Sequence, residues 1–226
     1  MKIPLFDIDQ TLITGRKILV DAYRFVFKKV YQVEASIEEV DNAGMISAEV
    51  IVETLKRHNF SFKEIRQKLP QAFKELGDYF VKNIKANDFI ALPGAKELLK
   101  KLKEKRVLIG VLTGNIDTIG WEKLKRTKLD QYIDFGVFGN MAFKRKDLVP
   151  LALEEAKKIL EKKIFFKNLV IIGDSFRDIL CAKENQIEVI GVASGKNTKE
   201  ELKKAGADLV IDSLLEKEKI FKFLGV

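Results

Sequence analysis

From its third residue the chain reads Ile3-Pro4-Leu5-Phe6-Asp7-Ile8-Asp9-Gln10-Thr11-Leu12-Ile13-Thr14-Gly15. The apolar run at the start of this stretch predicts a short buried strand, and the carboxylates of Asp7 and Asp9 follow it. Side chains alternate in direction along an extended backbone, so both carboxylates are expected on the same side. Buried carboxylates are costly unless a cation or hydrogen-bond donors compensate them. The stretch therefore predicts a charged site at the carboxyl end of a strand, where open α/β sheets bind ligands.

Two neighbouring carboxylates suit phosphoryl transfer. One can attack phosphorus and carry a covalent aspartyl-phosphate, while the other protonates the leaving oxygen and then deprotonates a water. A divalent cation would offset their repulsion. An EF-hand loop that begins at Asp7 is excluded, because Leu12 stands where glycine is needed and Ile18 where glutamate is needed. Asp-x-Asp is common by chance, so the function has to be argued from the rest of the chain.

The composition indicates a globular protein with a full α/β core and a smaller insert. The chain has 226 residues, of which 46% are hydrophobic. No apolar stretch approaches the roughly 20 residues of a membrane span, and Asp7 interrupts the first apolar run too early for a signal peptide. A single cysteine, Cys181, cannot form an internal disulfide, which fits a reducing compartment. We therefore expect a cytoplasmic protein with no membrane partner.

The charge balance is basic, with 41 Lys and Arg against 33 Asp and Glu, a net charge of +8. A nucleic-acid-binding face would gather basic residues on one side with aromatic residues among them. Here the lysines alternate with glutamates through the expected helices, as on solvated helix faces. This pattern does not favour a nucleic-acid partner. A modest positive field that attracts anionic phosphate substrates fits better.

Secondary-structure patterns divide the chain into a helical part and an alternating part. Helical spacing of apolar residues runs through 16–88, where Ser-x-x-Glu capping boxes at Ser36 and Ser61 predict helix starts, and Pro70 should kink or divide the last helix. After residue 95, helices alternate with apolar strands expected at 107–112, 135–138, 169–172, 188–192 and 208–211. This alternation predicts an α/β fold with a doubly wound, Rossmann-like parallel sheet.

The helical part lies between the first strand and the second. Crossovers in βαβ units are far shorter than this segment. We therefore predict a Rossmann-like core domain made of residues 1–15 and 89–226, with residues 16–88 inserted as an all-helical cap domain. The cap would lie over the paired aspartates as a lid.

Three further polar clusters follow expected strands. Thr113-Gly114-Asn115 offers hydrogen-bond donors for phosphate oxygens, although strand-to-helix turns commonly contain these residue types. Lys144-Arg145-Lys146 either neutralises a phosphate or forms a solvated basic turn. Asp174 directly follows a buried strand, which indicates a metal ligand, whereas Asp178 is either part of the same cluster or a first-turn acid favoured by the helix dipole.

In combination these clusters resemble the haloacid dehalogenase-like hydrolase superfamily, in its phosphatase branch with a helical cap, which is similar to phosphoglycolate phosphatase and β-phosphoglucomutase. The matching segments span essentially the whole chain: Asp7-Ile8-Asp9-Gln10-Thr11-Leu12, Val111-Leu112-Thr113-Gly114-Asn115, the Lys144 region, Gly173-Asp174-Ser175-Phe176-Arg177-Asp178, Ile190-Gly191-Val192-Ala193-Ser194-Gly195 and Ala205-Gly206-Ala207-Asp208.

The resemblance implies a role for each cluster. Asp7 would be the nucleophile and Asp9 the general acid and base. The phosphoryl group would bind at Thr113, with Gly114 and Asn115 beside it. The resemblance further implies that Lys144 steadies the charge, and that Mg²⁺ is bound by Asp7, Asp174 and the backbone carbonyl of Asp9, with Asp178 supporting the site.

Two departures from the family pattern leave alternatives open. Gln10 stands where glycine is usual, which alters the backbone turn or the cap hinge. The common Lys-Pro pair is absent, so Arg145 or Lys146 can hold the role assigned to Lys144.

The resemblance implies a cytoplasmic, Mg²⁺-dependent phosphatase, a monomer or a homodimer, that acts on a small phosphorylated metabolite. A phosphomutase is the nearest alternative, and a 2-haloacid dehalogenase is disfavoured because its chemistry needs no acid at Asp9. A phosphate-sensing protein without activity is disfavoured because every catalytic position holds a competent residue. Substrate specificity is expected to come from cap residues, with residues 44–49 and Arg16 as the first candidates.

Overall fold

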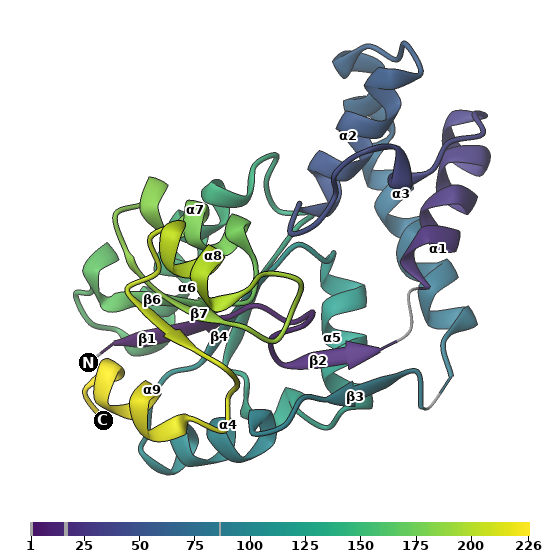
Figure 1. Cartoon of the computed structure of the whole chain (residues 1–226). Helices are drawn as coiled ribbons and strands as arrows, with labels where there is room; N and C mark the ends of the chain where they lie inside the picture. The colour runs from purple at the N-terminus through teal and green to yellow at the C-terminus, as the bar shows by residue number, and fades with distance from the viewer. Residues whose placement is uncertain (1, 16–17, 86) are drawn as a thin grey trace.

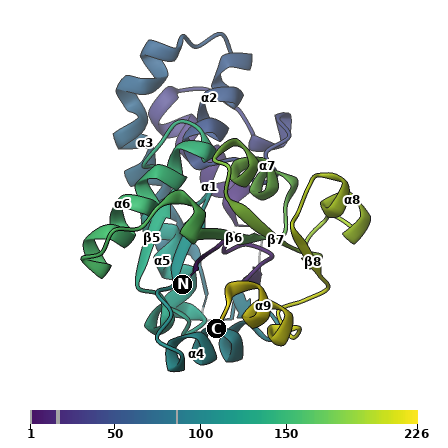
Figure 2. The same ribbon diagram turned by 90° about the vertical axis from the view of Figure 1, so that its left-hand side faces the viewer.

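A computed structural model describes residues 2–15, 18–85 and 87–226, so Arg16 lies outside the described residues. At its centre is a six-stranded parallel sheet in the order β5-β4-β1-β6-β7-β8, with helices on both faces (Figure 1 and Figure 2). The predicted α/β fold with a doubly wound parallel sheet is therefore confirmed.

The strands of this sheet are β1 (Ile3–Phe6), β4 (Gly110–Thr113), β5 (Phe135–Phe138), β6 (Leu169–Gly173), β7 (Glu188–Val192) and β8 (Leu209–Ile211). The helices packed around it are α4 (Ala95–Glu104), α5 (Asp117–Arg126), α6 (Leu148–Leu160), α7 (Phe176–Glu184), α8 (Lys199–Lys204) and α9 (Lys217–Leu224). The expected strands and helices are present within a few residues of their predicted bounds. Helices α5 and α9 were not among the expected elements.

Alternating side chains of the central strands pack on opposite faces of the sheet. Leu5 and Ile171 belong to a core cluster that includes apolar residues of α6, α7 and α8. Phe6 and Ile172 belong to a second cluster, on the side of α4, α5 and α9. Because both faces are covered, the central strands are apolar throughout, as expected for parallel sheets.

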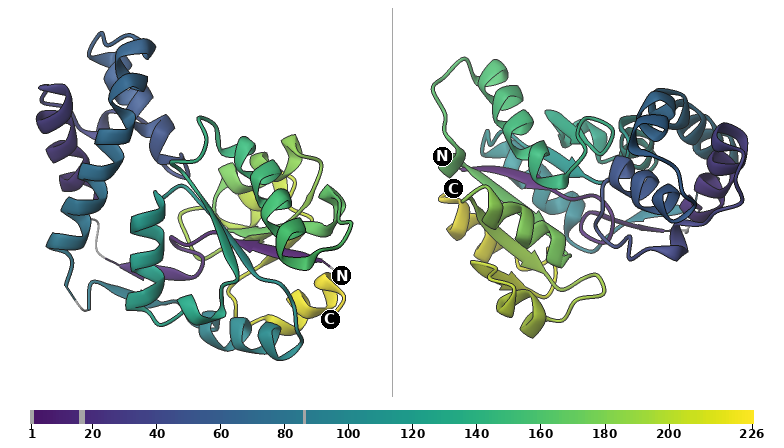
Figure 3. Two further views of the ribbon diagram at one scale, coloured as in Figure 1. Left: turned by 180° about the vertical axis from the view of Figure 1, so that it is seen from behind. Right: turned by 90° about the horizontal axis from the view of Figure 1, so that it is seen from above.

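The helical segment stands beyond the carboxyl ends of the strands (Figure 1 and Figure 3). It contains α1 (Leu19–Val26), a π-helical turn (Phe27–Tyr31), a 3-10 turn (Ile37–Glu39), α2 (Ser47–Arg57) and α3 (Phe62–Asn83). Both predicted capping boxes are present, but the one at Ser36 begins only the 3-10 turn. Pro70 lies inside α3, which continues through it as one helix. Buried residues on both sides of Pro70, such as Leu69 and Ala72, hold that helix against its neighbours.

Two short strands connect the helical segment to the sheet. β2 (Ile13–Gly15) pairs antiparallel with β3 (Phe89–Ala91), and Gly15 is opposite Phe89. A Cβ on Gly15 would lie 2.2 Å from the carbonyl oxygen of Asp88, so only glycine fits this close approach. The two chain crossings therefore lie side by side, at the predicted boundaries of the cap.

No helix within the described ranges combines the length and the apolar character that crossing a membrane requires.

Deleting residues 16–88 tests the predicted domain division. Because Gly15 is opposite Phe89 in the β2–β3 pair, a short turn can join the two ends. We expect a soluble protein that unfolds cooperatively, as an independent domain does. Its Tm should be lower than that of the full chain, because α3 packs against α5 and its removal exposes that face. Circular dichroism and a thermal melt measure both properties. An insoluble or unfolded product would show that the segment shares one core with the sheet.

Candidate active site

Polar residues at the carboxyl ends of three neighbouring strands meet at one edge of the sheet. Strand β1 lies between β4 and β6, so Asp7, Thr113 and Asp174 are adjacent. The backbone N–H of Asp7 continues the ladder, donating to the carbonyl of Ile172 at 2.9 Å. Residues far apart in the sequence are thus brought together where parallel α/β sheets bind ligands.

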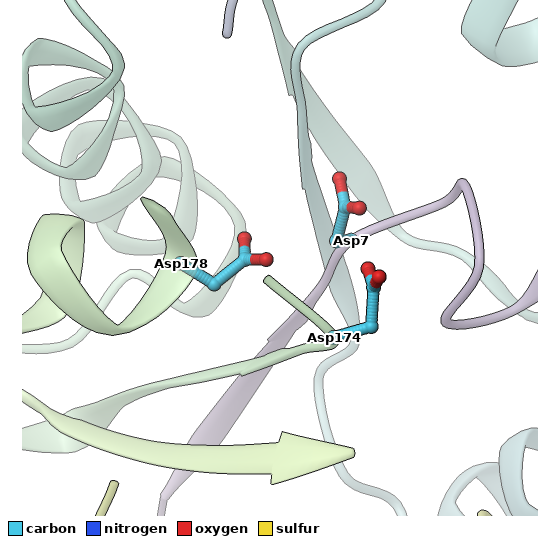
Figure 4. A group of neighbouring side chains, drawn as sticks. All are labelled: Asp7, Asp174 and Asp178. Atoms are coloured by element: carbon cyan, nitrogen blue, oxygen red, sulfur yellow. The ribbon is translucent and has the colours of Figure 1, made fainter. Parts of the chain in front are cut away.

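Asp7, Asp174 and Asp178 form a buried acidic cluster (Figure 4). One carboxylate oxygen from each lies within 4.8 Å of the others. Burial and the neighbouring Asp178 raise the pKa of Asp7 well above its usual value, and the same two causes raise the pKa of Asp174 to about 7. Oxygen ligands of this kind suit Mg²⁺, which would relieve the repulsion among the carboxylates. The side chains therefore fit a divalent cation.

Glycines make room for this cluster. A Cβ at Gly195 would lie 1.8 Å from Oδ2 of Asp174, and a Cβ at Gly173 would lie 2.3 Å from Cγ of Asp178. Thr11 is fully buried, and its hydroxyl donates to Oδ1 of Asp174 at 3.3 Å. Any side chain at either glycine would displace a carboxylate, so both glycines are part of the site.

Arg145 is the buried cation of the cluster. Its guanidinium donates to Oδ1 of Asp7 at 3.2 Å, to Oδ1 of Asp178, and to the backbone carbonyl of Gly44 at 3.0 Å. Burial lowers the pKa of Arg145, but the carboxylates of Asp178 and Asp7 outweigh it and raise that pKa above its ordinary value. Lys144, which the family resemblance favours for the basic role, is exposed, and Lys146 contacts Glu184 at 3.4 Å. Of the three candidates, Arg145 is the one in contact with the carboxylates.

Asp178 supports the cluster from inside the fold. It is fully buried at the start of α7, where its Oδ2 accepts from the N–H and the hydroxyl of Ser175 at 3.1 and 2.5 Å. Its Oδ1 accepts from Arg145. Both oxygens of Asp178 are therefore engaged by the protein.

The carboxylate of Asp9 does not join the acidic cluster. Both of its oxygens accept from the ammonium of Lys123 at 2.7 Å, and Oδ2 also accepts from Nδ2 of Asn115 at 2.8 Å. Lys123 was not among the sequence candidates. The available signal was its place in the apolar stripe of α5, with Ile119 and Leu124, where a lysine is unexpected.

The Thr113 hydroxyl accepts hydrogen bonds from the backbone N–H and the side-chain amide of Asn115, at 3.3 and 2.9 Å. Its own O–H is the remaining donor of that side chain. The carbonyl of Gly114 accepts hydrogen bonds from the N–H and the hydroxyl of Ser47, at 2.8 and 2.9 Å. A Cβ at Gly114 would lie 2.3 Å from the carbonyl oxygen of Met45, so this glycine permits contact with the helical segment.

A cavity of about 300 Å³ lies over these groups. Asp7, Asp9 and Asp174 contribute to its floor, and α1, α2 and the loop before α2 form the opposite wall. That wall consists of Leu19, Tyr23, Ile37, Asn42, Ala43, Gly44, Met45, Ser47 and Val50. It includes part of the predicted specificity segment 44–49. Burial raises the pKa of Tyr23 to about 12, and its hydroxyl is hydrogen-bonded to Ser47.

The unusual Gln10 occupies a left-handed turn with φ of 60°. Its carbonyl accepts from the hydroxyl of Ser194 at 2.5 Å, and its side-chain amide donates to Thr14 at 3.2 Å. A side chain in this conformation costs about 1–2 kcal/mol relative to glycine. These hydrogen bonds help to hold the turn without a glycine.

The geometry agrees with the comparisons to known proteins. The family model described as haloacid dehalogenase-like hydrolase matches residues 4–192. The chain belongs to this family. The resemblance drawn from the motifs is therefore confirmed, and with it the expectation of an enzyme of the hydrolase class.

Curated relatives of this haloacid dehalogenase-like hydrolase match it over nearly its whole length. A phosphorylated carbohydrates phosphatase of Thermotoga maritima is 27% identical, with 92% of each chain covered. A phosphoglycolate phosphatase of Vibrio parahaemolyticus is 26% identical over 96% of this chain and 94% of the relative. A crystal structure titled as a predicted phosphatase from Clostridium acetobutylicum superposes with a TM-score of 0.71 at 23% identity, covering 98% of both chains. This structural likeness shows the fold.

Substitutions test which of two basic residues, Arg145 or Lys144, is the buried cation of this haloacid dehalogenase-like site. Arg145→Met removes the buried cation and leaves Asp178 without its cationic partner, which typically costs about 3–5 kcal/mol of unfolding free energy. Lys144→Met is the matched control and should change stability by less than about 0.5 kcal/mol, because Lys144 is exposed. Urea unfolding measures both. Similar effects of the two substitutions would contradict the placement of the buried cation at Arg145.

Proposed function

We propose that this protein is a Mg²⁺-dependent phosphatase that hydrolyses a small phosphorylated metabolite through an aspartyl-phosphate on Asp7. The observation that carries the proposal is the different surroundings of its two cavity-floor aspartates. Asp7 lies in the acidic cluster beside Arg145, whereas Asp9 lies apart and is held by Lys123 and Asn115. Separate environments allow two carboxylates to take separate roles, one as nucleophile and one as acid and base.

In the proposed reaction an Asp7 carboxylate oxygen attacks the phosphorus atom while Asp9 gives its proton to the leaving oxygen. Asp9 then takes a proton from the water that hydrolyses the aspartyl-phosphate, so one carboxyl serves both steps. The guanidinium of Arg145 holds Asp7 in place, and the Thr113 hydroxyl is a donor available to a phosphate oxygen.

Asp7, Asp174 and the backbone carbonyl of Asp9 would hold the Mg²⁺. The ion supplies charge neutralisation for the phosphate and the carboxylates when bound. We assign Asp178 to support of the site, because its oxygens are already engaged by Arg145 and Ser175.

The cavity favours a small substrate. Its volume of about 300 Å³ is at the lower end of the range of ligand pockets. Its far wall combines apolar side chains with the hydroxyls of Tyr23 and Ser47. The relatives named above are phosphatases of phosphorylated carbohydrates and of phosphoglycolate. We propose a substrate of similar size, and the same architecture leaves a phosphomutase as the alternative.

Asp7→Asn tests the nucleophile. An amide does not form the acyl-phosphate, so turnover should be abolished while the fold is retained. Wild-type protein quenched in acid during turnover should gain the mass of one phosphoryl group on the peptide that contains Asp7, and the variant should not. Release of inorganic phosphate in proportion to substrate consumed distinguishes a phosphatase from a mutase. Retained turnover in the purified variant would falsify the mechanism.

Proton and metal should compete at Asp174. In the metal-free protein, burial and the neighbouring Asp178 raise the pKa of Asp174 to about 7, above the ordinary value of an aspartate, so the folded state binds the additional proton. The contribution of Asp174 to the free energy of unfolding is therefore greatest at low pH, and it falls as the pH rises towards about 7. Mg²⁺ binding needs the carboxylate, so the rise in Tm on adding Mg²⁺ should be larger near about pH 8 than near about pH 6.

Thermal melts with Mg²⁺ or with EDTA measure this difference. Asp174→Asn, which does not titrate, should remove most of the rise in Tm at both pH values, and chelation should stop wild-type turnover. A Tm at about pH 8 that does not respond to Mg²⁺, together with full activity in EDTA, would contradict the metal assignment.

A further inference from the structure

Lys123 is a buried charge on the face of α5 that packs into the core. Its side chain is 2% exposed, and α5 buries Ile119, Gly120 and Leu124 on the same face. A buried ammonium is costly unless it is paired and hydrogen-bonded. Here it donates to both carboxylate oxygens of Asp9 at 2.7 Å and to Oδ1 of Asn115 at 3.0 Å.

Two aromatic rings complete the surroundings of this ammonium. Its nitrogen lies 5.9 Å from the ring centroid of Phe80 and 5.6 Å from that of Phe89. The two rings are 5.7 Å apart. Both distances from the nitrogen allow cation–π attraction, which is stronger when the cation is desolvated. Phe80 belongs to α3 of the helical segment, and Phe89 begins β3. The ammonium thus lies where the helical segment, the connecting strands and Asp9 meet.

We propose that Lys123 is a positioning residue for catalysis, which orients the Asp9 carboxylate and links its orientation to the packing of the helical segment through Phe80 and Phe89. The inference rests on the proposed role of Asp9 as acid and base. Lys123 does not line the cavity, so it acts through Asp9 rather than on the substrate.

The need for such a residue follows from the exposure of Asp9. Its side chain is 43% exposed, so its carboxylate can rotate into solvent unless something holds it. The contacts with Lys123 and Asn115 hold both of its oxygens. Proton transfer requires the carboxyl within hydrogen-bond reach of the leaving oxygen, and a displacement of about 1 Å can cost about 10²-fold in rate.

The test is a double-mutant cycle between Lys123→Met and Asp9→Asn, with glycerol 3-phosphate and p-nitrophenyl phosphate as substrates. The alkoxide of glycerol needs a proton as it leaves, whereas p-nitrophenolate does not. Lys123→Met should lower kcat/KM on glycerol 3-phosphate by about 10- to 100-fold through kcat, with a much smaller loss on p-nitrophenyl phosphate. In the Asp9→Asn background the same substitution should cause little further loss, because its target is already removed.

Lys125→Met is the matched control, since Lys125 is exposed on the same helix two residues away. It should leave kcat/KM unchanged on both substrates. A purely structural role of Lys123 predicts equal losses on the two substrates, and losses that add to those of Asp9→Asn. Either result would overturn the proposal, and so would a rise in kcat, which would mean that Lys123 holds Asp9 away from the substrate.

Phe80→Leu and Phe89→Leu keep Lys123 and its charge while loosening the space around the ammonium. If Lys123→Met does not fold, these two variants carry the test. Each should lower kcat/KM more on glycerol 3-phosphate than on p-nitrophenyl phosphate. The loss on glycerol 3-phosphate should be about 3- to 10-fold and should disappear in the Asp9→Asn background. Equal losses of kcat/KM on the two substrates would contradict the proposed link between the two rings and the orientation of Asp9.

The two proposals fail in different ways. Wild-type protein that releases no phosphate from either substrate with Mg²⁺ present would overturn the proposed function. Wild-type activity that Asp9→Asn reduces and Lys123→Met does not would overturn the positioning role alone.

Discussion

The guanidinium of Arg145 binds three acceptors from three distant parts of the chain. They are the carboxylate of Asp7 after β1, that of Asp178 on α7, and the carbonyl of Gly44 in the helical segment. Three carboxylates crowded at one sheet edge would repel one another, and burial makes their charged forms still more costly. A buried cation offsets part of this cost in the absence of metal. It also ties the loop before α2 to the floor of the cavity.

Each of the two carboxylates after β1 has its own buried cation. Arg145 is paired with Asp7, and Lys123 is paired with Asp9. Their surroundings differ in exposure, because Asp7 is buried among other acids while Asp9 remains partly open to the cavity. Two carboxylates with one residue between them can therefore differ in function, because Arg145 and Lys123 give them different partners.

Backbone carbonyls accept several of the hydrogen bonds that join the helical segment to the rest of the fold. Ser47 donates twice to the carbonyl of Gly114, and Arg177 donates to the carbonyls of Ala43 and Asp41. Ala43, Ser47 and Gly114 also line the cavity over the aspartates. A displacement of the helical segment would therefore change the positions of residues in both the wall and the floor of the cavity.

The sequence alone determined the alternating α/β fold and the nature of the acidic residues, because apolar strand patterns and carboxylates at strand ends are local features. It placed Asp7, Thr113 and Asp174 at or after the carboxyl ends of strands, and the strand order of the folded sheet made those ends adjacent. It left three neighbouring cations as candidates for one position, because adjacent residues in a turn carry no sign of which one points inward. Only the tertiary structure selected Arg145 for contact with the carboxylates.

Lys123 belongs to α5, a helix outside the elements expected from the sequence pattern. Its partners, Asp9 and Phe89, are distant in the chain, and only folding brings them within reach of its ammonium. The tertiary structure likewise decided that α3 continues through Pro70, because packing on both sides outweighs a local preference. Local pattern thus determined which chemistry the chain carries. Long-range packing decided which basic side chains pair with the carboxylates, since burial and pairing depend on the whole fold.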